Sequence, residues 1–127
     1  MGKRPGLSKA ELEVFNLVVK LGEARVRDVV AAMPGDRGLD FFTVQTYLRR
    51  LKIKGYLKTR REGRADVYLP AVKSASVIRD VTADFLKRVF GGEPLPLMQH
   101  LIEDHGLSDE QIDQLQAALD EFRRRKM

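Results

Sequence analysis

The chain has 127 residues, 43% of them hydrophobic, which suffices for one packed domain or two very small ones. It has no cysteine, which excludes disulfides and thiolate metal sites, and no run of the ~20 apolar residues that a membrane span needs. Residues 1–73 hold 16 of the 23 Lys and Arg but 8 of the 18 Asp and Glu, so this basic front half is suited to a polyanionic partner.

Two helices are predicted at the start of the chain. Ser8 and Glu11 form a capping box, in which both side chains accept hydrogen bonds from free backbone N–H groups at a helix start. Apolar residues then recur at helical spacing until Gly22, where the first helix should end. A second apolar stripe runs from Val26 to Met33 and closes at Pro34.

A third helix is expected between Asp40, a suitable N-cap, and about Lys54. Its inward face has the spacing of a buried stripe, at Val44, Tyr47, Leu48 and Leu51. Its outward face carries side chains that can donate hydrogen bonds to base edges and phosphates: Thr43, Thr46 and Arg50, flanked by Gln45, Arg49 and Lys52. Between positions 43 and 61 the sequence has no carboxylate that could neutralise the cations.

A β-hairpin should follow the three helices. Residues 56–61 and 65–69 have strand character, 62–64 form a tight turn, and Pro70 closes the second strand. Three arginines gather around the turn, where long cationic side chains could reach a DNA backbone: Arg60, Arg61 and Arg64. A helix-turn-helix followed by a basic hairpin has the element order of a winged helix, whose third helix enters the major groove.

From about Lys73 only helices are predicted. The glycines at 91–92 and Gly106 separate three of them, and a capping box of Ser108 with Gln111 opens the last. The fold class is therefore mainly α with a small β-hairpin.

The predicted organisation is a winged helix-turn-helix DNA-binding domain in residues 1–72 and a helical dimerisation domain in residues 73–127. The rear helices carry many large apolar residues but form no obvious closed bundle. We expect them to be buried against a second copy, with packing on the chain's own front half as the alternative. The residues expected at the dimer interface are Ile78, Val81, Phe85, Val89, Leu101, Ile112, Leu115, Leu119 and Phe122.

Four segments are similar to those of a known family: LSKAELEVF (7–15), TVQTYLRRLKIKGYL (43–57), RREGR (60–64) and FLKRVFGG (85–92). In these segments the chain resembles the penicillinase-repressor (BlaI/MecI) family, and the resemblance covers nearly the whole chain. It implies a winged-helix transcriptional repressor that dimerises through its C-terminal helices and binds a double-stranded DNA operator with two-fold symmetry.

The resemblance also implies roles for individual residues. The family's groove-facing positions, which read bases, fall on Phe42, Thr43, Thr46 and Arg50. Its backbone-contact positions fall on Gln45, Arg49 and the wing residues Arg61 and Arg64. Phe42 departs from the polar residue found in some members. It could contact a thymine methyl group or pack against Tyr47, and we favour packing.

Two departures from the family bear on regulation. In the best-known members a membrane sensor-protease inactivates the repressor by cutting an Asn-Phe bond in the fifth helix. The aligned pair here is His100-Leu101, which argues against that partner and that mode of induction. The copper-responsive branch carries cysteine pairs near its C-terminus, and this chain has no cysteine, which excludes copper sensing through thiolates.

No catalytic motif is present, so neither enzyme activity nor a cofactor is expected. The two histidines, His100 and His105, do not share a helix face well and are expected to be surface residues rather than metal ligands. We therefore expect a cytoplasmic, sequence-specific repressor. The alternatives are a winged-helix module that binds an acidic protein partner and a non-specific architectural DNA binder.

Overall fold

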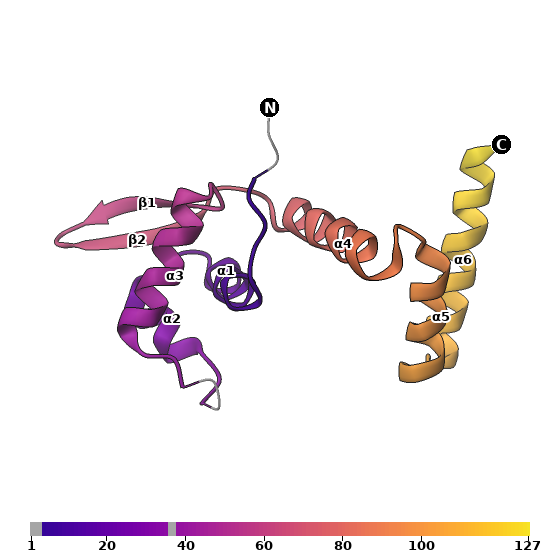
Figure 1. Ribbon diagram of the computed structural model, residues 1–127, viewed down its shortest axis with the longest axis horizontal. Coiled ribbons are helices and arrows are strands. Elements are labelled where there is room, and N and C mark those ends of the chain that lie inside the picture. Colours follow the sequence, from indigo (N-terminus) through magenta and orange to yellow (C-terminus); the bar gives the residue numbers. More distant parts are fainter. Residues whose placement is uncertain (1–3, 36–37) are drawn as a thin grey trace. The chain divides into compact units, whose positions relative to one another are not determined.

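Three helices and a β-hairpin come first in the computed structural model, which describes residues 4–35 and 38–127, and three further helices follow (Figure 1). This order confirms the predicted fold class. The elements are α1 (Lys9–Leu21), α2 (Val26–Ala32), α3 (Phe41–Ile53), β1 (Leu57–Glu62), β2 (Ala65–Pro70), α4 (Ser74–Phe90), α5 (Pro94–His105) and α6 (Asp109–Lys126).

Local capping accounts for where the helices start. At α1 the Glu11 backbone N–H donates to Ser8 Oγ at 3.1 Å, and the Ser8 N–H donates to Glu11 Oε1 at 2.8 Å, so the predicted capping box is formed. At α3 the Asp40 carboxylate accepts from the Thr43 N–H at 2.8 Å. The hydrogen bond at Asp40 lowers the pKa of this carboxyl below its ordinary value.

The first strand of the hairpin lies one residue later than predicted, and the second begins at Ala65 as predicted and ends one residue later, at Pro70. The two strands pair in antiparallel register from Leu57 with Pro70 to Glu62 with Ala65. The turn therefore consists of Gly63 and Arg64, and Gly63 has a φ of 64°, which only glycine adopts without strain. Tyr56 lies outside the strand because its backbone N–H is bonded to Leu51 O at the end of α3.

A bridge that the sequence does not reveal extends this small sheet. The backbone groups of Ala24 and Tyr68 exchange two hydrogen bonds, of 2.9 and 2.7 Å. They attach the segment between α1 and α2 to the inner strand of the hairpin. The base of the hairpin is thus held in place by the helices, as a wing must be if it is to present its tip at a fixed distance from α3.

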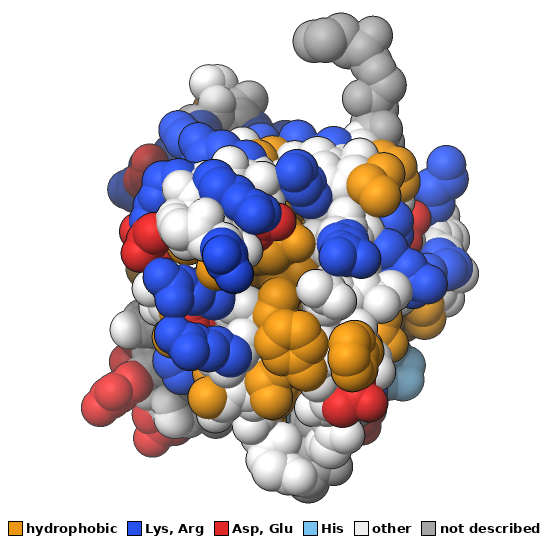
Figure 2. Space-filling model, turned by 90° about the vertical axis from the view of Figure 1, so that its left-hand side faces the viewer, with side chains coloured by type: hydrophobic (Ala, Val, Ile, Leu, Met, Phe, Trp, Pro, Cys, Tyr) orange, Lys and Arg blue, Asp and Glu red, His pale blue; other side chains and the backbone are white. Residues whose placement is uncertain are grey.

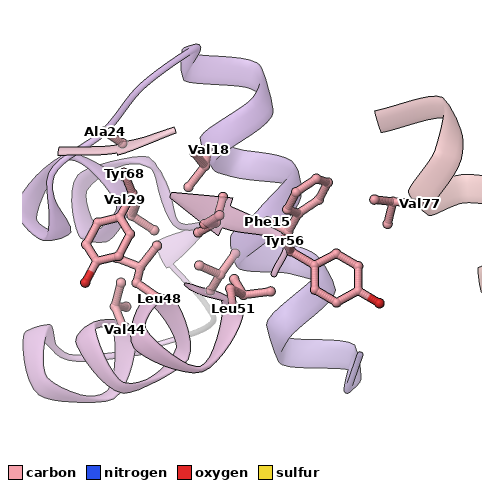
Figure 3. Close-up of a cluster of buried hydrophobic side chains, with 12 residues drawn as sticks. Phe15, Val18, Ala24, Val29, Val44, Leu48, Leu51, Tyr56, Tyr68 and Val77 are labelled. Carbon is pink, nitrogen blue, oxygen red and sulfur yellow. The ribbon is translucent and has the colours of Figure 1, made fainter. Parts of the chain in front are cut away.

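The hydrophobic core lies between α1, α2, α3 and the base of the hairpin (Figure 3). Val44, Leu48 and Leu51 are fully buried, which confirms the inward face predicted for α3. The rings of Phe15 and Tyr56 meet edge to face, with their centres 6.0 Å apart. Because these side chains come from every element of the first unit, the core fixes the orientation of α3.

The chain divides into two compact units between Thr82 and Ala83, within α4. The first unit extends beyond residue 72, the predicted boundary, because Val77 at the start of α4 is buried in its core. Val81, one turn later, also packs against this core. A helical residue committed to the core of its own chain has little surface left for a partner, so Val81 is not part of the dimer surface that we propose.

The second unit has no core of its own. None of residues 83–127 is buried, and α5 and α6 contain no buried residue at all. The apolar side chains of this unit that are predicted to lie in the dimer interface are half exposed, among them Leu101 at 49% and Leu119 at 52%. Among the described residues, no helix is both long enough and apolar enough to cross a membrane.

One buried ion pair joins α1 to the end of α3. Lys54 Nζ lies 2.7 Å from Glu11 Oε1 and 2.9 Å from the Gly6 carbonyl oxygen, and the Glu11 side chain is 3% exposed. Burial alone would raise the pKa of Glu11. The hydrogen bonds from Lys54 and Ser8 outweigh burial and bring this pKa below its ordinary value of 4.5.

We expect Glu11→Gln to lower the free energy of unfolding by about 1–3 kcal/mol at pH 7, since it leaves Lys54 without its charged acceptor. A carboxyl whose pKa is lower in the folded state stabilises the protein above its unfolded pKa, and this contribution is lost as the pH falls through the folded value. Urea unfolding between pH 7 and pH 3 should therefore show the variant approaching the parent in acid. Glu103→Gln, at an exposed carboxylate of α5, is the control, and a difference that persists at pH 3 would contradict the prediction.

Candidate nucleic-acid interface

The outward face of α3 carries the residues that the sequence predicts. Thr46, Arg49 and Arg50 are exposed, while Thr43 and Gln45 are partly buried at the edges of this face. The guanidinium carbon of Arg50 lies 5.9 Å from the centre of the Tyr47 ring. Arg50 is therefore held by an aromatic contact that leaves its N–H groups free to donate.

Phe42 does not pack against Tyr47, so the packing that we favoured from the sequence is wrong. Its side chain is 75% exposed, and its ring meets the edge of Phe41 at a centre-to-centre distance of 5.8 Å. The reason is helical geometry: residues three or four apart share a face, whereas residues five apart, such as Phe42 and Tyr47, diverge by roughly 140°. The ring is consequently presented outward at the first turn of α3.

The hydroxyl of Thr46 is occupied within the helix. Its Oγ1 donates to the Phe42 carbonyl oxygen at 3.0 Å, the back-bonding expected of threonine in a helix. This hydroxyl has no hydrogen left for a base edge and can act there only as an acceptor. Among the predicted base readers, Arg50 is thus the strong donor.

A hollow of about 430 Å³ lies between the start of α2, the middle of α3 and the hairpin tip. Five arginines line it together with a single carboxylate, Asp66: Arg25, Arg27, Arg49, Arg61 and Arg64. Gln45 of α3 also reaches into it. Figure 2 shows this side of the molecule, where Lys and Arg side chains surround a central hydrophobic area. The hollow therefore has the charge and the volume to receive an anionic group.

Arg60 is turned away from this hollow and is neutralised. Its Nη2 lies 2.5 Å from Glu23 Oε2 and 2.9 Å from Glu62 Oε2. These hydrogen bonds raise the pKa of Arg60 above its ordinary value. The pKa of Glu62 is lowered in turn by Arg60 and Arg25. The sequence has no carboxylate within 43–61, but carboxylates from outside this span pair with three of its cations: Glu11 with Lys54, Glu23 and Glu62 with Arg60, and Asp66 with Arg61.

The period of a β-strand explains why neighbouring wing arginines differ. Alternate residues of β1 point to opposite faces, so Arg60 joins Glu62 on one face while Arg61 faces the hollow on the other. Arg61 is paired with Asp66 at 3.2 Å. Arg64 lies in the two-residue turn, outside this alternation, and it lines the hollow without an ion pair to any described residue.

Sequence reasoning missed the two arginines of the α2 region. Arg25 pairs with Glu62 at 3.0 Å, whereas Arg27 makes no ion pair or hydrogen bond with the described part of the chain. Arg27, Arg49 and Arg64 come from three elements that are distant in sequence and meet at one hollow. In the sequence Arg25 and Arg27 are two cations beside a short apolar stripe, and this pattern does not show which distant arginines lie near them.

The histidines of the rear unit are not gathered with carboxylates into a metal site among the described residues. Within residues 4–35 and 38–127 no three His, Asp or Glu side chains gather so that they could hold a metal ion. His100 lies in α5 with its Nδ1 3.2 Å from Asp104 Oδ2, and its ring contacts Phe90. The His100-Leu101 pair is thus internal to a regular helix.

Known proteins are similar to this chain over most of its length. A family model described as "Penicillinase repressor" matches residues 7–121. The penicillinase repressor of Bacillus licheniformis is 32% identical over 99% of this chain and 98% of its own length. The methicillin resistance regulatory protein MecI of Mammaliicoccus sciuri is 23% identical over 89% of this chain and 92% of its own length. Among solved structures, the DNA-binding domain of the repressor BlaI is 35% identical, with a TM-score of 0.51 over 59% of this chain and 92% of that domain.

Proposed function

The chain belongs to the penicillinase repressor family of DNA-binding transcriptional repressors, and from this premise we propose that it binds a two-fold operator as a homodimer, one α3 helix in each major groove. The observation that carries this proposal is the continuity of the outward face of α3 with the arginine-lined hollow. A side chain that reads a base must lie beside side chains that bind the DNA backbone, because the contacts with the DNA backbone set the position of the protein along the duplex.

We propose that two groups of residues divide these tasks. Phe42, Thr43, Thr46 and Arg50 face the base edges, with Arg50 as the donor to a guanine or a similar acceptor pair. The hollow receives a phosphate of the backbone between Arg27, Arg49 and Arg64, with Gln45 as a further donor. Arg61 contributes less to binding of the DNA backbone, because its guanidinium is paired with Asp66. Arg60 is no longer included among the residues that contact the DNA backbone, because it is paired with Glu23.

We propose that the second unit is covered by another copy of itself. Its largest exposed apolar side chains fall on α4, α5 and α6, and those of α6 follow the 3–4 spacing of a helix-pairing seam at Ile112, Leu115, Leu119 and Phe122. The first turn of α6 is acidic and its last turn holds four cations. Two antiparallel α6 helices would therefore place each acidic end beside a basic end, which favours self-association over an unrelated partner.

We propose a cytoplasmic protein without catalytic activity, since the interface of α3 and the hollow is suited to holding DNA and includes no nucleophile paired with a base. We also infer that induction does not use cleavage at His100-Leu101, which replaces the Asn-Phe pair. Incubation of the full chain with a sensor-protease of the family, followed by mass spectrometry, checks this. A cut between these two residues would contradict it.

The test of the proposed function is a titration of labelled promoter DNA against a scrambled duplex of equal length over a salt series. A specific repressor should prefer its site by roughly 10³-fold or more. If the dimer neutralises about eight phosphates, log affinity should fall with log salt at a slope near −7. Equal affinity for both duplexes would indicate an architectural binder. No affinity for either would indicate a protein-interaction module.

The two wing arginines should behave differently. We expect Arg64→Ala to weaken binding to all duplexes about equally and to reduce the salt slope by roughly one per subunit, because an unpaired cation that contacts a phosphate is lost. Arg60→Ala should leave the salt slope unchanged, since that guanidinium is already held by Glu23 and Glu62. Fluorescence anisotropy over a salt series measures both. If Arg60→Ala changed the salt slope more than Arg64→Ala, the opposite face of the wing would be the one that contacts DNA.

A further inference from the structure

An exposed aromatic ring on the face of α3 that meets DNA contributes little to folding. Phe42 is 75% exposed, and its ring contact in the described structure is with the edge of Phe41. A phenyl ring left in water gains none of the stabilisation that burial would give. The ring therefore calls for a contact outside the chain, and Phe41, which it touches, lines the arginine-lined hollow.

The polar groups around this ring are satisfied internally. The Thr46 hydroxyl donates to the Phe42 carbonyl oxygen at 3.0 Å, and the Thr43 N–H donates to Asp40 at 2.8 Å. The first turn of α3 thus offers an apolar surface rather than hydrogen-bond donors. Apart from Gln45 at the edge of this face, the side-chain donors of α3 lie about two turns later, at Arg49 and Arg50.

The chemistry of the major groove restricts what an apolar surface can recognise there. Each base pair shows donors and acceptors, but only thymine adds a methyl group, at C5. The arginines around the hollow favour a polyanion over an apolar protein partner or a lipid tail. We infer that Phe42 is a specificity-determining residue that selects thymine at one position of each half-site, through contact between its ring and the C5-methyl group.

This inference rests on the proposed function, because it assigns a base to one side chain of the same interface. The test begins with the full chain and a pool of random-sequence duplexes, from which bound DNA is selected and sequenced. One position per half-site should be enriched in thymine. Replacing that thymine by uracil, which differs only by the methyl group, should weaken binding about fourfold per half-site, the effect of about 0.8 kcal/mol for one buried CH₂ group.

Variants of Phe42 distinguish contact with the thymine methyl group from a different mode of binding, in which the ring inserts between two base pairs. With Phe42→Ala the thymine and uracil duplexes should bind within about twofold of each other, whereas Phe42→Leu should keep part of the preference. Ile53→Ala is the matched control, because Ile53 is an 84% exposed apolar residue at the other end of α3, and it should keep the full fourfold difference. Circular dichroism checks that each variant is folded.

The possible failures are distinguishable. A selected site at which uracil substitution has no effect, or at which Phe42→Ala keeps the full effect, overturns the thymine assignment and leaves the proposed function intact. Insertion of the ring would appear as equal weakening of both duplexes by Phe42→Ala, with the uracil effect unchanged, and this also overturns the assignment. A pool without any enriched sequence overturns the proposed function and this inference with it.

Discussion

Leu119→Glu is expected to convert the protein into a monomer and to reduce operator affinity by about 10²- to 10⁴-fold. Leu119 lies in the middle of the α6 seam and is half exposed in the single chain. Burial of a leucine contributes about 1.5–3 kcal/mol, and in a two-fold interface the loss occurs twice. In a dimer, binding at one half-site holds the second DNA-binding unit at high effective concentration beside the other half-site. A monomer lacks this gain in affinity.

The measurement for Leu119→Glu combines sedimentation equilibrium at micromolar concentration with operator titration. Ala117→Glu is the matched control, because it adds the same charge to α6 on the face opposite the seam, and it should remain dimeric. Thermal unfolding of the N-terminal unit should be unchanged in both variants. A Leu119→Glu protein that still sediments as a dimer would show that α6 is not the pairing surface.

The charged ends of α6 allow a further check of the antiparallel arrangement. A variant with Asp109 and Glu110 changed to lysine has two basic ends, and one with Arg123, Arg124, Arg125 and Lys126 all changed to glutamate has two acidic ends. Each variant should dimerise poorly by itself, and the two mixed should form a heterodimer. Parallel pairing would also favour the mixed pair. Parallel pairing, however, would place like ends together in the unmodified chain as well, so each variant by itself would then dimerise no worse than the unmodified chain.

The elements of the fold were predictable because their signals are local. Ser8 with Glu11 and Ser108 with Gln111 are hydrogen-bonded partners three residues apart, and the sequence alone contains both members of each pair. The inward stripe of α3 follows from the helical period, and the buried Leu48 confirms it. For the same reason the outward position of Arg50 could be predicted.

The errors concern partners that are distant in sequence. Arg60 is neutralised by Glu23, which lies 37 positions away and approaches only because the Ala24–Tyr68 bridge brings the start of α2 to the hairpin. The same bridge brings Arg27 to the hollow, and no local pattern contains that information. Phe42 is a different case, since its exposure follows from helical geometry but contradicts the usual burial of phenylalanine.

Arg50→Ala is expected to cost about 1–3 kcal/mol of binding free energy per half-site, so that a dimer loses about 2–6 kcal/mol on its operator. The structure supports this expectation because Arg50 is exposed, has no carboxylate partner among the described residues and is steadied by the Tyr47 ring. The loss should be accompanied by relaxed preference at one base pair per half-site. Titration of operators mutated one base pair at a time measures this.

Arg50→Lys separates base reading from charge. Lysine keeps the cation but lacks the planar fork that pairs with two acceptors on one base, so the preference should relax while the salt slope stays unchanged. This pattern is the opposite of that expected for Arg64→Ala, which should change the salt slope and leave the base preferences intact. If Arg50→Ala instead weakened scrambled DNA as much as the operator, Arg50 would be a backbone contact, and base recognition would rest on the first turn of α3.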